Sequence, residues 1–127
     1  MPFIEDVMQL RRFSPEKLQK VNLFETPHMF CDVYCLEPGQ QQKPHTHDGA
    51  TKFYYVLEGR GVFRIESEER ELGPGGMAIA RRGVLHGVRN DSSERLTLLV
   101  SMAPNPNLQN EAGPRAGWCR CNAGISA

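Results

Sequence analysis

Three of the four histidines in this sequence have the spacing of metal ligands. His45 and His47 are separated by one residue, and His86 follows in a later segment of the chain. Side chains alternate faces along a β-strand, so the first two rings would point the same way and could bind one ion together. A third imidazole from a neighbouring strand would complete a three-nitrogen site with open positions for water or substrate. We therefore predict a divalent transition metal at these residues, and the pattern does not choose among Fe, Mn, Ni, Co, Cu and Zn.

Short strands must position these ligands, because the middle of the chain consists of apolar runs broken by glycine and proline. Such a pattern is typical of an all-β barrel or sandwich. The breaks contain turn residues such as Pro38-Gly39 and Gly73-Pro74-Gly75-Gly76. Six segments have the composition expected of strands, namely residues 30–36, 52–57, 61–66, 77–80, 85–89 and 96–102. No convincing long helix separates them, which argues against an α/β fold.

Differences in amino-acid composition divide the chain into three regions. We predict an N-terminal arm at 1–26, a β-barrel at 27–104 and a C-terminal tail at 105–127, the last rich in Pro, Asn and Gly. Within the arm, Ser14-Pro15-Glu16 could cap a short helical turn. The segment from Leu18 to Phe24 has no clear helical stripe and could equally be an added edge strand.

Length and composition exclude several classes of protein. The 127 residues fit a single domain, and fifteen basic side chains balance fifteen acidic ones, so neither nucleic acid nor a membrane is expected as a partner. The first residues lack the pattern of a signal peptide and no run reaches the length of a membrane span, so we expect a cytoplasmic protein. In a reducing compartment the four cysteines, including Cys119 and Cys121 of the tail, are expected to be structural or incidental thiols.

One group of residues resembles the first motif of the cupin superfamily, G-x5-H-x-H-x3-4-E-x6-G. In this chain Gly39 precedes His45-x-His47, followed by Lys52 in place of the glutamate and then by Gly59. The departure matters, because the glutamate is a metal ligand in the family, whereas a lysine at neutral pH is a cation with no lone pair to donate.

A second group resembles the other cupin motif, G-x5-P-x-G-x-x-H-x-x-x-N. Gly75, Gly83, His86 and Asn90 occupy its positions, and Arg81 replaces the turn proline. The resemblance implies a small double-stranded β-helix, or jelly-roll, barrel with a metal in its mouth, to which the predicted N-terminal arm is added. It also implies a homodimer, because cupins of this size are typically dimers.

Lys52 creates an electrostatic problem beside such a metal. An ammonium about 5 Å from a dication, at an effective dielectric near 20, is disfavoured by roughly 6 to 7 kcal/mol. Lys52 could turn aside onto a carboxylate, lose its proton and act as base or fourth ligand, or share an anionic substrate with the metal. A fourth alternative is a pocket without metal, in which the amine fills the space. Strand alternation places Tyr54 on the same face as Lys52, where its hydroxyl could orient a substrate or its ring could fill the barrel.

Two classes of function follow from these residues. The first is a three-histidine metalloenzyme acting on a small oxygenated or anionic substrate, with Lys52 and Tyr54 as candidate catalytic residues. Within the family, three-histidine sites resemble those of dioxygenases, which we favour, and isomerases also occur. The second is a non-catalytic module that binds or senses a small ligand, and the fold alone does not decide between the two.

Overall fold

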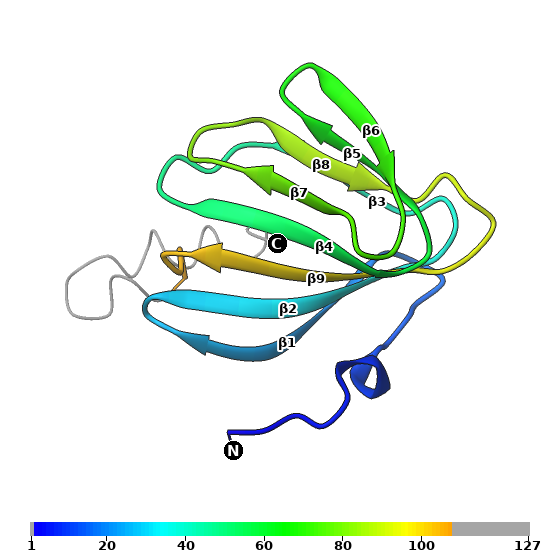
Figure 1. Ribbon diagram of the computed structural model, residues 1–127, viewed down its shortest axis with the longest axis horizontal. Coiled ribbons are helices and arrows are strands. Elements are labelled where there is room, and N and C mark those ends of the chain that lie inside the picture. The colour runs from blue at the N-terminus through cyan, green and yellow to red at the C-terminus, as the bar shows by residue number, and fades with distance from the viewer. Residues whose placement is uncertain (1, 108–127) are drawn as a thin grey trace.

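The computed structural model describes residues 2–107, and these form nine strands in two antiparallel sheets. One sheet has the order β1-β2-β9-β4-β7 and the other the order β3-β8-β5-β6 (Figure 1). The first contains β1 (Gln19–Thr26), β2 (Met29–Leu36), β9 (Leu96–Ala103), β4 (Thr51–Glu58) and β7 (Met77–Ala80). The second contains β3 (Gln41–His45), β8 (His86–Arg89), β5 (Gly61–Ile65) and β6 (Glu68–Leu72). The expected all-β jelly-roll architecture is confirmed.

The core lies between the two sheets and follows the alternation of side chains along the strands. On β4, Lys52, Tyr54 and Val56 are buried, while the residues between them are partly exposed. The Tyr54 ring lies 5.5 Å from that of Phe63 on β5, which joins the sheets across the interior. The apolar cluster around them draws on both sheets and includes Phe30, Tyr34, Leu36, Val88, Leu96, Leu98, Val100 and Met102.

All six predicted strands are present, and three more strands join them. The segment from Leu18 to Phe24 lies largely in the edge strand β1, which pairs with β2. The strand β3 was not predicted. The strand β6 was not predicted either; it carries the acidic segment around Glu68 and Glu71 and is an exposed edge strand paired with β5. The chain makes no helix at Ser14-Pro15-Glu16; its short 3-10 helix, η1, spans Val7–Leu10.

Gly59 of the first motif is required by the backbone at the end of β4. Its φ angle is +84°, and a β-carbon there would lie 2.2 Å from the carbonyl oxygen of Arg95. A side chain would therefore collide with the backbone that leads into β9. The motif glycine allows the β4–β5 turn to pass close to the start of that strand.

The segment just after β9 remains packed against the barrel. Asn105 is fully buried, and its Nδ2 atom donates a hydrogen bond of 2.9 Å to the carbonyl of Thr26. Most of the predicted tail, with Cys119 and Cys121, lies outside the described residues, and the three regional boundaries remain predictions. Across residues 2–107, no helix is both long and apolar enough to traverse a bilayer.

Candidate metal centre

The three predicted ligands come together at one end of the four-stranded sheet. His45 ends β3 and pairs in register with His86, which begins β8, while His47 follows β3 by two residues. The ring centroid of His45 lies 4.4 Å from that of His86 and 4.9 Å from that of His47. One ligand atom from each ring lies within 4.8 Å of the other two. The predicted convergence is confirmed, although the strand ends at His45 and so alternation along one strand does not bring His47 to the site.

Backbone carbonyls orient two of the rings. The Nδ1 atom of His45 lies 2.8 Å from the carbonyl oxygen of Lys43, and that of His86 lies 2.8 Å from the carbonyl oxygen of Val84. Only a protonated ring nitrogen can bond to a carbonyl, so Nε2 carries the lone pair in both neutral rings. These two Nε2 atoms are buried without a hydrogen-bond partner. A divalent metal fits this donor set, because it would satisfy both lone pairs.

A local distortion of β3 places His45 opposite His86. The register between β3 and β8 shifts between Gln42 and His45, where Pro44 has no N–H to offer the ladder. Gly87 on β8 faces this distortion, and a β-carbon there would lie 2.8 Å from the Gln42 carbonyl oxygen and 2.9 Å from the Pro44 nitrogen. The absence of a side chain at residue 87 thus lets the two ligand strands approach.

The surroundings favour the neutral form of His45 and His86. Burial lowers the pKa of His86 to about 3, and the nearby Lys52 adds to the effect. Burial also lowers the pKa of His45, with the charges of Lys52 and Lys20 acting in the same direction. A metal binds the neutral imidazole, so these ligands need not release protons at neutral pH.

Lys52 lies in the interior beside this centre and is only 1% exposed. Its Nζ atom donates a hydrogen bond of 3.1 Å to the Oε1 atom of Gln42. The same nitrogen lies 4.9 Å from the ring centroid of Tyr54 and 5.4 Å from that of Tyr34. Burial lowers the pKa of Lys52 well below its usual value, with a further contribution from Lys20. An amide oxygen and two aromatic faces therefore hold the amine that replaces the motif carboxylate.

Tyr54 shares the inner face with Lys52, as expected, and binds the same amide. Its hydroxyl donates a hydrogen bond of 2.6 Å to Gln42 Oε1, and its ring centroid lies 6.2 Å from that of His86. Burial raises the pKa of Tyr54, so the phenol keeps its proton. Gln42 also donates from Nε2 to the Tyr34 hydroxyl at 3.4 Å. The sequence interpretation missed Gln42 because the polar strand that carries it was not predicted.

A second polar group lies on the inner face of β1 and β2. Lys20 pairs in register with Tyr34, and its Nζ atom lies 5.7 Å from the centroid of that ring. Asp32, nearly buried on β2, accepts a hydrogen bond of 2.8 Å from Asn22. Burial raises the pKa of Asp32. Neither Lys20 nor Asp32 was identified from the sequence, because their segments carried no recognisable ligand spacing.

Comparison with known proteins gives relatives of similar size and fold. The crystal structure of TT1209 from Thermus thermophilus has a TM-score of 0.77 and 48% identity, and covers 80% of this chain and 96% of that one. A Klebsiella pneumoniae protein described as having a double-stranded beta-helix domain has a TM-score of 0.74 and 25% identity, covering 80% and 89% of the two chains.

A curated relative carries a functional description. The oxalate-binding protein of Thermotoga maritima is 30% identical over 65 residues, which are 51% of this chain and 54% of that protein. The family model described as a cupin domain, Cupin_2, matches residues 32–102, a span that exceeds half of the chain and includes all three clustered histidines. This protein belongs to the cupin family.

Proposed function

We propose that this protein is a three-histidine metalloenzyme that acts on a small anionic or oxygenated molecule, with dioxygenase-like oxidation as the favoured reaction. The observation that carries the proposal is the convergence of His45, His47 and His86, with their ligand atoms within 4.8 Å of one another, beside the interior amine of Lys52. Such a centre offers nitrogen ligands to a metal and a hydrogen-bond donor to an anion.

The histidines would hold the ion, and the residues behind them would position the substrate. A divalent metal bound there would supply Lewis-acid polarisation of a substrate oxygen and, for a redox-active ion, electron transfer. Lys52 would donate hydrogen bonds to an anionic group of the substrate and neutralise its charge. Tyr54 would act on Lys52 through Gln42, whose Oε1 atom accepts from both side chains. This makes Lys52 the candidate substrate contact and Tyr54 a positioning residue.

The description of one relative supports an anionic ligand. The Thermotoga maritima relative is an oxalate-binding protein, and oxalate is a dianion with oxygens that chelate a metal. With lysine in place of the motif glutamate, three neutral ligands leave the double charge of the ion undiminished, which favours an anion in the open positions.

A non-catalytic carrier or sensor of a small ligand is the second candidate. The same relative is named for binding, and Lys52 removes the carboxylate ligand of the family motif. In this alternative an anion could bind to Lys52 without any metal. The two candidates differ in whether a chelator abolishes binding and whether substrate is consumed.

Metal content and turnover test the proposal in order. The purified protein is loaded with Fe(II), Mn(II), Co(II), Ni(II), Cu(II) or Zn(II), and bound metal is measured by elemental analysis. We expect one ion per chain, and less in His86→Gln; the matched control is His28→Gln, because His28 is exposed and outside the cluster. Oxygen consumption with diketones and catechols then tests the dioxygenase.

The outcomes separate the two functions. Oxygen uptake that requires the metal and is lost in His86→Gln supports the enzyme. Oxalate binding that persists after chelation, with no turnover, supports the module and contradicts the metalloenzyme. The expected homodimer is a separate proposal. Its test is the molar mass of the protein in solution, measured by light scattering during size-exclusion chromatography.

A further inference from the structure

A groove opens between the arm and the four-stranded sheet. It has a volume of about 570 Å³ and lies between residues 16–20, which lead into β1, and residues 39–41 at the start of β3. Lys17 and Lys20 line one side, and Gln40 and Gln41 line the other. The histidines do not line this groove, so any link to the metal centre must pass through side chains that face both.

Lys20 provides such a link. It is paired with Tyr34, so both side chains project from the same face of the sheet, where Tyr34 is fully buried and Lys20, on the edge strand β1, is exposed. Its Nζ atom lies 5.7 Å from the Tyr34 ring centroid, and the Nζ atom of Lys52 lies 5.4 Å from that same centroid. Two amines, one in the groove and one beside the histidines, therefore share one aromatic ring.

The charges around this ring favour an anion. Lys17, Lys20 and Lys52 lie in or beside the groove with the carboxylates of Glu16 and Asp32, and a hydrogen bond from Asn22 already engages Asp32. The chain as a whole has no net charge, so this concentration of positive charge is local. A divalent ion at the histidines would increase it further.

We infer that Lys20 forms a second anion subsite, so that the ligand of this protein carries two acidic groups, one at the histidines and Lys52 and the other at Lys20. The inner half of this assignment rests on the proposed function, and the outer half rests on the groove. Because Lys20 lines the groove and Lys52 does not, a ligand that reaches both amines needs a spacer between its acidic groups, so succinate or glutarate fits better than oxalate, whose carboxylates are joined directly. The substrate class is thus a small, flexible dicarboxylate.

Binding of simple acids to the metal-loaded protein tests the subsite. Acetate, oxalate, succinate and glutarate are titrated by calorimetry into the wild type, Lys20→Gln and Lys17→Gln. Lys17 lines the same groove and carries the same charge, so Lys17→Gln controls for the general loss of a cation. We expect glutarate or succinate to bind more tightly than acetate, and Lys20→Gln to weaken this binding about tenfold or more, the value of one charge-assisted hydrogen bond.

The comparison among acids distinguishes the subsite from a structural effect. Acetate affinity and metal content are expected to be unchanged in Lys20→Gln, and Lys20→Arg is expected to restore most of the dicarboxylate affinity. Equal weakening for acetate and glutarate, or equal losses in Lys17→Gln and Lys20→Gln, would overturn the inference.

The failure of the proposed function gives a different pattern. If acetate and oxalate bind through the metal but Lys20→Gln changes no affinity, the subsite is wrong and the metalloenzyme stands. If glutarate binds the metal-free protein and still depends on Lys20, the subsite stands and the metal proposal is weakened. If no acid binds in either state, both are wrong.

Discussion

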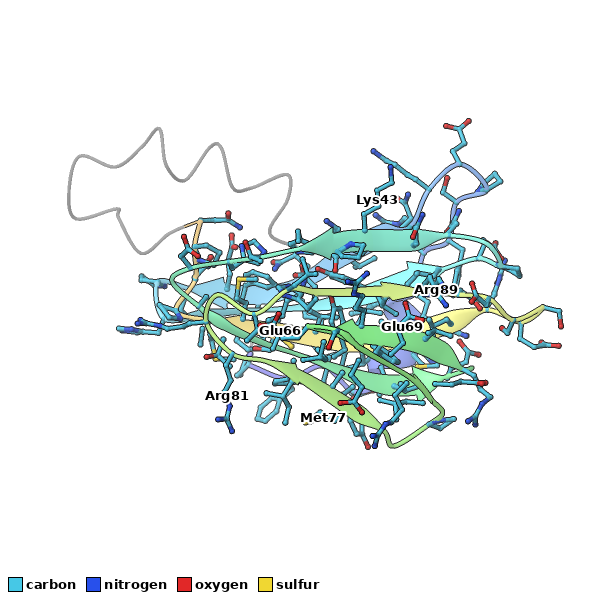
Figure 2. All side chains as sticks on the ribbon, turned by 90° about the horizontal axis from the view of Figure 1, so that it is seen from above. Lys43, Glu66, Glu69, Met77, Arg81 and Arg89 are labelled. Atoms are coloured by element: carbon cyan, nitrogen blue, oxygen red, sulfur yellow. The ribbon has the colours of Figure 1, made fainter. Side chains whose placement is uncertain are left out.

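Replacement of Lys52 tests whether its positive charge opposes the metal. Lys52→Met removes the charge and keeps an unbranched side chain of similar length, so the buried space stays filled. Lys52→Glu in addition restores the carboxylate of the family motif. Lys43→Met is the matched control. It removes the same charge, and Lys43 projects from β3 at the surface of the barrel (Figure 2).

The size of the effect follows from the charge and from its protonation. An unshielded ammonium about 5 Å from a dication at an effective dielectric near 20 costs roughly 6 to 7 kcal/mol. The repulsion cannot reduce the free energy of metal binding by that much, because the amine gives up its proton whenever deprotonation costs less. Deprotonation costs about 1.4 kcal/mol for each unit by which the pKa of the amine exceeds the working pH. Burial has already lowered the pKa of Lys52. We therefore expect Lys52→Met to bind metal about tenfold more tightly near pH 7.

The dependence on pH is the decisive measurement. While the amine of the metal-free protein is protonated, each unit of decrease in pH costs the wild type about tenfold more affinity than it costs Lys52→Met. Competition with a coloured chelator at several pH values measures the metal affinity of the wild type and of Lys52→Met. Lys52→Glu should bind metal more tightly than Lys52→Met, because its carboxylate adds a ligand. Parallel curves for the wild type and Lys52→Met would refute the repulsion. Weaker binding by Lys52→Met would instead identify the amine as a metal ligand.

Three further predictions concern the elements that build the centre. Gly87→Ala should lower metal affinity at least about tenfold in the same competition assay, because its β-carbon would displace β3 from β8; unchanged affinity would contradict the role of this close approach. Gln42→Leu should lower the free energy of unfolding in urea by about 1 to 3 kcal/mol, because the buried Tyr54 hydroxyl loses its acceptor; an unchanged value would show that the bond contributes little. The metal-free protein should lose thermal stability as pH falls below about 6.5, since His86, with a folded-state pKa of about 3, is protonated first in the unfolded chain; a flat profile between about pH 7 and pH 4 would contradict the lowered pKa.

The strands that sequence reasoning found are those with an apolar inner face. On β4 and β9, buried side chains alternate or run continuously through the core, and the pattern predicts them directly. The strands that it missed bury little. β6 has four exposed residues followed by one partly buried residue, and β3 is polar apart from a proline. Such edge strands are fixed by backbone pairing with a neighbour, as β6 pairs with β5 and β3 with β8. Side chains add to this, since Glu69 of β6 and Arg89 of β8 form an ion pair across the intervening β5 (Figure 2). That information is not local in sequence.

The candidate site divides in the same way. The histidines were predictable because metal ligation restricts both residue type and spacing, and the second motif supplied the missing third ligand. Gln42 and Lys20 were not, because an amide or an amine gains its role only from what the fold places beside it. The structural reason that His45 faces His86 also escaped prediction, since it depends on a register shift that Gly87 accommodates.

The exchange of a carboxylate for an amine at residue 52 changes which ligands the centre favours. With a motif glutamate, one negative charge would offset a divalent ion before any substrate arrived. With Lys52, the ion loses that ligand charge. Gln42, Tyr34 and Tyr54 contact the amine, and the carboxylate of Asp32 favours its protonated form. An arriving anion, or proton loss at Lys52, would then relieve the repulsion between the ion and the amine. Because an anionic ligand would relieve the repulsion between the ion and Lys52, metal and anion should each tighten the binding of the other, by equal factors. Measuring metal affinity with and without glutarate, in the wild type and in Lys52→Met, tests this reciprocity, and the coupling should fall when the lysine is removed.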